Sequence, residues 1–249
     1  MRYHLLDALR GLALIGMIIY HFCYDLTEIF QVSLAWFQGT GIHYWQQLNC
    51  AVFILISGIC VHFSRHLLRR GILISLWGGV ISVFTAVFIP EEQIILGILS
   101  FLGIMMIFCT FLKPLLNYTK KEPRFFLAVA LLGFYIFYSL PQDYLNFFFW
   151  QISIPESWHN LGAVSNLLGF KTEQFSSADY FPLLPWSFLF LSGYFIWAII
   201  AKCPPQFLKC RIVFLSFFWQ TFLISLSFAP ASHLCTFKRL FCSSITLCS

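Results

Sequence analysis

Long apolar runs, separated by short clusters of Lys and Arg, constrain the fold of this chain more than any other feature. A helix needs about 20 mostly apolar residues to cross a bilayer, because its backbone polar groups must be satisfied within the segment. The predicted fold class is therefore an all-α, polytopic transmembrane helix bundle. By the same criterion we expect seven spans, at residues 8–29, 47–65, 71–89, 94–116, 124–140, 182–201 and 211–229.

The composition argues against soluble and disordered chains. The 249 residues are 59% hydrophobic and 10% charged, with a mean hydropathy of +0.81. Soluble domains are about 25% charged, and disorder requires low hydrophobicity. The net charge of +5 does not indicate a nucleic-acid partner, because the basic residues form no stripe interleaved with polar ones. The nine cysteines have no paired spacing, so we expect neither a metal site nor a disulfide framework.

The loop charges predict the orientation. Between the expected spans, loops 30–46 and 90–93 contain no Lys or Arg, and the long segment 141–181 contains only Lys171. Basic loops remain in the cytoplasm, so we expect a cytoplasmic N-terminus and a multi-pass protein of the cell (inner) membrane. The aromatic runs in 141–181 fit either an interfacial or a re-entrant position. The basic residues gather in the alternate segments 2–10, 65–70, 113–124 and 202–211.

The first expected span carries ionisable residues that a simple anchor would not need. Asp7 and Arg10 are three residues apart and can neutralise each other on one helix face. His21 follows Arg10 by eleven residues, about 16 Å along a helix and close to three full turns, and Asp25 follows His21 by four. We interpret His21 as a general base that Asp25 orients, with Arg10 holding an anionic group. The alternatives are a buried structural trio and charges that lie at the interface.

The same residues resemble a known family. The stretch RYHLLDALRGLALIGMIIYHFCYDL at residues 2–26 is similar to the opening of transmembrane acyltransferases. It most resembles bacterial relatives of heparan-alpha-glucosaminide N-acetyltransferase, a group related to the acyltransferase-three family. Three later segments agree with this resemblance, which covers most of residues 2–201: FILISGICVHFSR, LGILSFLGIMMI and SADYFPLLPWSFLFLSGY.

The resemblance implies acyl transfer across the bilayer. Cytoplasmic acyl-CoA, with acetyl-CoA as the expected co-substrate, would supply the acyl group to a carbohydrate-like acceptor at the outer face. A histidine acts as the base in such proteins. Arg10 matches the arginine of the motif and His21 matches its histidine. One position departs from the pattern, because Ser100 stands where the relatives often have a histidine, and a second-histidine role would need that side chain.

Two further sets of residues fit more than one role. Arg65 and Arg69, at the inner end of the second span, can bind CoA phosphates or only set the topology. Gly58 and Gly193, each preceded by a serine, are expected to serve close helix packing.

Two residues near the outer face also have open roles. Asp179 can hydrogen-bond a sugar acceptor, or it can cap the helix that Pro182 begins. His43 lies in an aromatic loop and can contact a sugar, whereas Trp45 beside it fits an interfacial anchor.

The C-terminal segment differs in character from the rest of the chain. We divide the sequence into a transmembrane acyltransferase-like domain at 1–217 and a divergent segment at 218–249. Codons can be chosen for Trp219–Phe222 that read Gly-Arg-His-Ser when shifted by one base, and codons for Phe228–Ser232 can conceal His-Gln-Pro. The related acyltransferases carry both motifs in this region. We therefore expect that a frameshift replaced the C-terminus, which would leave this chain incomplete and inactive.

Two other classes of function remain open from the sequence. In a transporter or permease, Arg10, His21 and Asp25 would form a proton or anion relay, but no pair of matched half-sequences of the inverted-repeat kind is found. A membrane subunit without chemistry of its own is the third class. The bilayer is the expected partner in all three.

Overall fold

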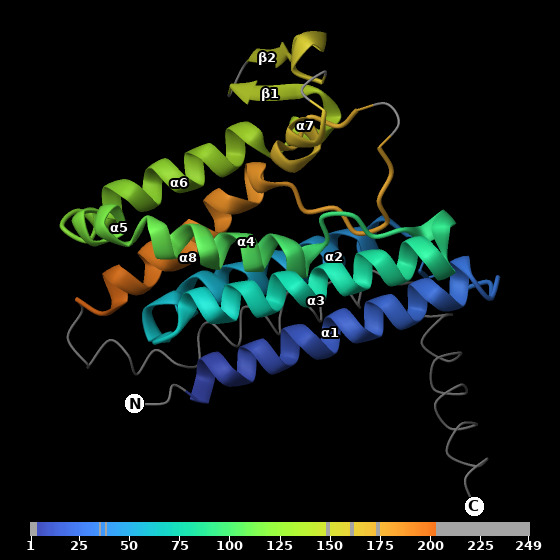
Figure 1. Cartoon of the computed structure of the whole chain (residues 1–249), viewed down its shortest axis with the longest axis horizontal. Helices are drawn as coiled ribbons and strands as arrows, with labels where there is room; N and C mark the ends of the chain where they lie inside the picture. The colour runs from blue at the N-terminus through green and yellow to red at the C-terminus, as the bar shows by residue number, and fades with distance from the viewer. Residues whose placement is uncertain are drawn as a thin grey trace, which may run out of the picture. The chain divides into compact units, whose positions relative to one another are not determined.

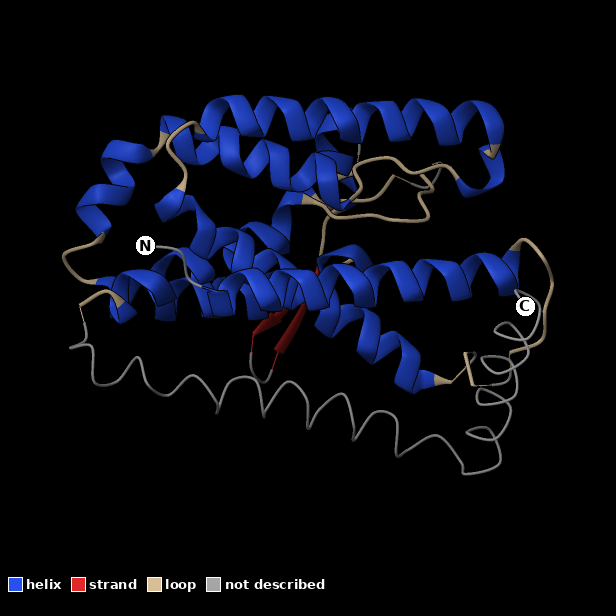
Figure 2. Ribbon diagram, turned by 90° about the horizontal axis from the view of Figure 1, so that it is seen from below, coloured by secondary structure: helices blue, strands red, loops and turns tan. Residues whose placement is uncertain are grey.

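The described part of the chain divides into two compact units, whose helices and strands are labelled in Figure 1. One unit extends through Phe53 and the other comprises Ile54–Lys202. Helices account for most of both units, and Figure 2 shows two short strands as the exception. The seventh expected span, 211–229, and the segment 218–249 lie outside the described residues. The computed structural model describes residues 4–34, 36–37, 39–147, 150–159, 162–172 and 175–202.

The first unit pairs α1 (His4–Glu28) with the first part of α2 (Thr40–Cys60). α1 covers the first expected span. α2 begins at Thr40, whereas the apolar run predicted a start at residue 47. The difference arises because the early turns of α2 are polar and aromatic but still pack on α1. The Trp45 ring lies 6.1 Å from that of Tyr20, centroid to centroid.

The second unit contains the end of α2, the remaining helices and both strands. α3 packs along α4, and α6 packs along α8. Its longer elements are α3 (Leu67–Phe88), α4 (Ile98–Phe111), α5 (Lys113–Thr119), α6 (Pro123–Phe137), β1 (Tyr144–Phe147), β2 (Trp150–Ser153), α7 (Ala163–Leu168) and α8 (Leu183–Ile200). Its 3-10 turns are η1 (Val61–Phe63), η2 (Pro90–Glu92), η3 (Leu140–Gln142) and η4 (Glu156–Trp158).

Within the described residues, five helical segments are long and apolar enough to cross a bilayer, or six if a bent pair counts as one span. The bent pair is α4 and α5, which meet at 79° inside the expected span 94–116. Pro114 explains the break, because proline lacks the N–H that a continuous helix needs but is tolerated in a first turn. The five segments are Leu6–Glu28, Gly41–Phe63, Leu67–Phe88, Pro123–Gln142 and Leu183–Ile200.

Glycines bring α2 and α8 into close contact. A Cβ at Gly58 would overlap the carbonyl oxygen of Phe190, and a Cβ at Gly193 would overlap that of Leu55. The approach is reciprocal and sets backbone against backbone, as small residues permit between membrane helices. The close packing predicted at both glycines is confirmed.

α3 shows the surface expected of a helix in lipid. Its buried residues are Gly71 and Gly78, where α4 packs against it. The rest of α3 presents a contiguous exposed apolar surface. Such a surface would be unfavourable in water, and lipid removes that cost. The protein is therefore a multi-pass membrane protein. Its large exposed side chains are Leu68, Ile72, Leu73, Leu76, Trp77, Val80, Ile81, Val83, Phe84, Val87 and Phe88.

The segment 141–181 contains the strands, which the all-α prediction did not include. β1 and β2 form an antiparallel hairpin, with Tyr144 opposite Ser153 and Phe147 opposite Trp150. The chain enters the hairpin through Asp143, which has a left-handed φ of 67°. The sequence obscures the strand pattern, because four consecutive aromatic residues at 147–150 resemble a continuous apolar run.

Candidate functional site

α1 has two apolar faces with different surroundings. One face packs inside the first unit, and the other is exposed as a lipid-facing surface would be. The packed face carries Leu9, Ala13 and Cys23, which are 5%, 0% and 6% exposed. The open face carries Leu12, Ile15, Ile18, Ile19 and Phe22.

A polar stripe runs along α1 between these two faces. α1 is one uninterrupted helix, so at 100° per residue Asp7, Arg10, His21 and Asp25 fall within an arc of about 60°. All four side chains are exposed. The His21 ring lies nearly perpendicular to the ring of its neighbour Tyr20, with centroids 5.7 Å apart. The catalytic and donor-binding roles of these residues stay predictions.

A buried amide sets the rotation of α1 against α2. Asn49 is 5% exposed, and its Nδ2 donates to the carbonyl oxygen of Ala13 at 3.0 Å. Gly16 leaves room for this amide, because a Cβ there would lie 2.9 Å from Asn49 Oδ1. A hydrogen bond to a backbone carbonyl fixes which face of α1 turns inward, and hence where the polar stripe points. Sequence reasoning missed Asn49, although an amide directly before the apolar run 50–56 was the available signal.

A pocket of about 330 Å³ opens where α1 ends and α2 begins. Its imidazole is that of His43, which was predicted to contact a sugar, and its carboxylate is that of Glu28, which was not predicted. Glu28 lies at the same angle on α1 as Arg10, eighteen residues or five turns away, so it continues the polar stripe. The pocket is lined by Tyr20, Tyr24, Thr27, Glu28, Phe37, Gly39, Ile42 and His43.

Asp179 caps a helix, but not the one expected. Its Oδ2 accepts a hydrogen bond at 3.2 Å from the N–H of Ile98, the first residue of α4. Ser177 Oγ accepts in turn from the N–H of Ile95 at 2.9 Å. α8 begins after Pro182 with no side-chain cap, so the predicted capping of α8 is wrong. Contact of Asp179 with an acceptor stays a prediction.

The segments before α4 and α8 are joined by backbone hydrogen bonds as well. The Ala178 N–H donates to the Gln93 carbonyl at 3.0 Å, and the Phe181 N–H donates to the Leu96 carbonyl at 2.9 Å. Burial raises the pKa of Tyr180, which lies within this junction. The two segments begin stretches that carry the family resemblance, LGILSFLGIMMI and SADYFPLLPWSFLFLSGY. The two stretches that resemble the family therefore meet at one structural junction.

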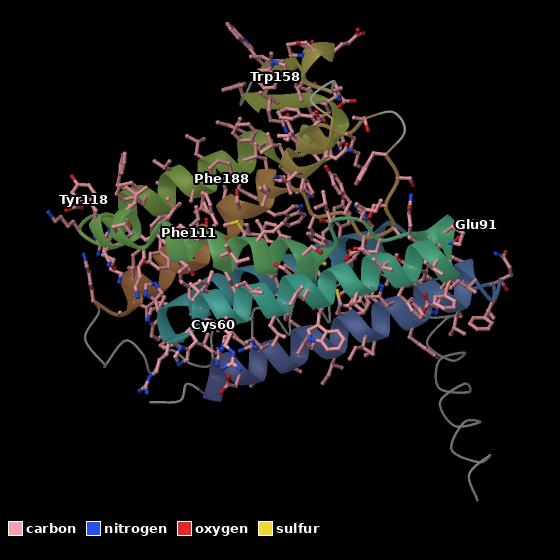
Figure 3. All side chains as sticks on the ribbon, viewed as in Figure 1. Cys60, Glu91, Phe111, Tyr118, Trp158 and Phe188 are labelled. Carbon is pink, nitrogen blue, oxygen red and sulfur yellow. The ribbon has the colours of Figure 1, made fainter. Side chains whose placement is uncertain are left out.

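Arg65 and Arg69 lie at the basic end of the second unit. Arg65 precedes α3 and Arg69 is in its first turn, and both are exposed. The preceding turn, η1, packs on the last part of α8. Beyond α8, Lys202 Nζ donates to the carbonyl oxygen of Lys121 at 3.0 Å. Figure 3 shows nitrogen-bearing side chains gathered near the labelled Tyr118.

The predicted residues belong to both units. The stripe and His43 belong to the first unit, whereas Arg65, Arg69 and Asp179 belong to the second. Arg65 and Asp179 lie at opposite ends of their unit, because α3 runs between these ends over 22 residues, about 33 Å at 1.5 Å per residue. Among the described residues, no group of three or more His, Cys, Asp or Glu is placed to hold a metal ion.

Comparison with known proteins adds a family. Residues 2–213 match the family model described as heparan-alpha-glucosaminide N-acetyltransferase, catalytic. The matched range contains the polar stripe, the pocket and the junction at Asp179. It confirms the resemblance drawn from the motif at residues 2–26. No curated protein and no solved structure matches the chain.

Proposed function

This chain belongs to the heparan-alpha-glucosaminide N-acetyltransferase family, and from that membership we propose that it is an integral membrane acyltransferase. It moves an acetyl or other acyl group from cytoplasmic acyl-CoA to a sugar-like acceptor at the outer face of the cell (inner) membrane. The family match over residues 2–213 carries the proposal. Acetyl-CoA is the donor that the family name favours.

The polar stripe of α1 supplies the reacting groups in this proposal. His21 is the general base, and Asp25, one turn further along the same face, orients its imidazole and stabilises the imidazolium. Arg10 lies toward the other end of α1 and binds the phosphates of the donor. The distance along the helix, about 16 Å, suits a donor whose phosphates and thioester lie at opposite ends of a long arm.

The chemistry is one acyl transfer between two nucleophiles. His21 takes a proton from the acceptor amine or hydroxyl, and the freed nitrogen or oxygen attacks the thioester carbonyl carbon. The carbon–sulfur bond then breaks and CoA leaves as a thiolate. The imidazolium returns its proton to that thiolate. The products are the acylated acceptor and free CoA, and the enzyme is unchanged.

Basic residues place the donor on the cytoplasmic side. Arg65 and Arg69 assist Arg10 in binding acyl-CoA, since planar guanidinium groups match phosphate oxygens. Their position at the basic end of the second unit supports a cytoplasmic location for that end. The N-terminus of α1, which carries Arg10, lies on the same side of the membrane in this proposal.

The pocket between α1 and α2 receives the acceptor. The rings of two tyrosines and one phenylalanine line it, together with the imidazole of His43 and the carboxylate of Glu28. Aromatic walls bind the apolar face of a sugar ring, and a few polar groups fix its orientation. His43 and Glu28 are the groups that would hydrogen-bond the hydroxyl or amino groups of the acceptor. Asp179 remains a second candidate for this contact.

Reconstituted protein tests the proposal. Liposomes that contain the full chain receive acetyl-CoA on one side and an amino sugar or a neutral sugar on the other, and transfer of labelled acetyl is counted. His21→Ala should reduce transfer to background while leaving thermal stability unchanged, because the side chain is exposed. His66→Ala is the matched control, since it removes another exposed histidine that has no proposed role.

Two outcomes would contradict the proposed acyltransferase activity. Transfer that survives His21→Ala would show that His21 is not the base, and exchange of a small solute without any acyl donor would indicate a transporter.

We also keep the proposal that residues 218–249 arose by a frameshift. The nucleotide sequence tests it, and a neighbouring frame without another apolar, motif-bearing span would rule it out.

A further inference from the structure

The β1–β2 hairpin separates apolar from polar side chains. Side chains alternate between the two faces of a strand, and paired residues share a face. The pairings place Leu145 opposite Ile152 and Phe147 opposite Trp150 on one face. The other face holds the pairs Tyr144 with Ser153 and Asn146 with Gln151. One face is therefore wholly apolar and the other wholly polar or phenolic.

The apolar face is open over most of its area, and the β2 residues of the polar face, Gln151 and Ser153, are exposed as well. Phe147, Trp150 and Ile152 are 42%, 76% and 50% exposed. The polar face is tied to the rest of the unit, because Asn146 Nδ2 donates to Ser139 Oγ at 2.6 Å. A hairpin in water would turn these faces the other way, with its apolar side against the protein.

Charge is confined to the base of the hairpin. Residues 144–155 contain no Asp, Glu, Lys or Arg. At the base, Asp143 Oδ1 lies 3.6 Å from His159 Nε2, and His159 Nδ1 lies 2.7 Å from the carbonyl oxygen of Lys171. The residues that follow β1 in sequence are Phe148 and Phe149. Polarity thus falls from the base toward the end of the hairpin where Phe147 pairs with Trp150.

The hairpin also continues a surface that lipid covers. The candidate span of α6 and η3 ends at Gln142, and β1 begins at Tyr144. β1 packs on the end of α6, and Figure 1 shows it running back over that helix. The exposed side of α6 carries Leu131, Leu132 and Tyr135, and the exposed Tyr138 follows the end of the helix. A segment two residues beyond a span lies at the membrane boundary, so its apolar face meets the same bilayer as α6.

We propose that the apolar face of the β1–β2 hairpin inserts into the interfacial layer of the lipid bilayer, where it anchors the segment between α6 and α8. Four residues of β1 reach about 13 Å at 3.3 Å per residue, and interfacial elements bury their apolar faces about 5–10 Å into the headgroup and acyl boundary. Trp150 supplies the amphipathic ring that favours this depth. The hydrocarbon centre is excluded, because the outer edges of two strands carry backbone groups that lipid tails cannot satisfy.

Other occupants fit the face less well. A stable dimer needs about 800 Å² from each partner, which the side chains of two four-residue strands do not provide. A sugar needs polar groups among the apolar ones, and this face has none. The bilayer interface requires neither a large protein contact area nor polar groups on the apolar face, so it fits this small uncharged surface at the end of a span.

Neighbouring residues on opposite faces give a matched test. The full chain carries a cysteine at Trp150→Cys or Ile152→Cys on the apolar face, or at Gln151→Cys or Ser153→Cys on the polar face. Each variant is labelled with an environment-sensitive fluorophore, reconstituted in phosphatidylcholine liposomes, and titrated with brominated lipid. The unsubstituted chain, labelled in the same way, gives the background from native cysteines. We expect quenching at 150 and 152 to exceed that at 151 and 153 at least twofold.

A second measurement needs no substitution. Lipids with a diazirine in the upper acyl chain are activated by light, and labelled peptides of the unsubstituted protein are mapped by mass spectrometry. Labels on Leu145, Trp150 or Ile152 support the anchor, as does the alternating quenching. Equal access of a water-soluble quencher to all four positions overturns it. Disulfides between chains at Ile152→Cys would indicate that a second copy of the chain covers the face, which contradicts the bilayer proposal. Shielding that appears only with added sugar would indicate that a saccharide covers it, which also contradicts the proposal.

Discussion

Replacing Gly193 by alanine should increase the distance between α8 and α2 and lower the stability of the protein. A Cβ at this position would overlap the carbonyl oxygen of Leu55. That oxygen belongs to a helix backbone, so no side-chain rotation can relieve the overlap and the two helices must separate. Gly58 makes the reciprocal contact with Phe190, and separation would loosen both contacts together.

The magnitude follows from two opposing terms. Overpacking a well-packed contact costs about 1–3 kcal/mol, and a backbone clash belongs at the upper limit of that range. Alanine gains back about 1 kcal/mol over glycine in a helix. Gly193→Ala should therefore destabilise the protein by about 2 kcal/mol. For a chain of this size that corresponds to a fall in Tm of about 4–8 °C.

Thermal unfolding in detergent or liposomes measures the change, and Gly79→Ala is the matched control. Gly79 is also helical, but a Cβ there meets nothing within 4 Å. Its alanine variant should be as stable as the parent or up to about 1 kcal/mol more stable. Opposite signs at the two glycines are the expected result. Equal stability of Gly193→Ala and the parent would refute the close crossing of α2 and α8.

Three further changes have defined outcomes. Asp179→Ala should lower stability by about 1 kcal/mol through loss of the α4 cap, with a smaller effect for Asp179→Asn; a change in acceptor KM alone, with Tm unmoved, would contradict the capping role. Asn49→Ala should cost about 1 kcal/mol by removing the bond to Ala13, and unaltered Tm would show that this bond contributes nothing. Burial raises the pKa of Tyr180, so its contribution to stability is complete below the unfolded pKa of about 10 and is lost as the pH rises toward the folded value. Stability should therefore fall above about pH 10, and Tyr180→Phe should flatten that fall in an alkaline titration followed by circular dichroism.

The sequence by itself determined the membrane helices and the stripe. A membrane span needs an apolar run about 20 residues long, so the positions of α1, α3, α6 and α8 can be predicted from the apolar runs alone. The common face of Arg10, His21 and Asp25 follows from helical periodicity, because α1 is continuous. The family too was visible in local motifs, and the match over residues 2–213 confirmed it.

Only the tertiary structure decided which residues hold these helices in place. Asn49 bonds a residue 36 positions away, and Asp179 caps a helix 81 positions away. Periodicity within one segment cannot report such partners, because it records which face is apolar and not what that face meets. For the same reason, the alternation of β1 and β2 in sequence could not show that their apolar face is left exposed. That depends on Asn146 bonding to Ser139, a contact that exists only once the hairpin has folded back on α6.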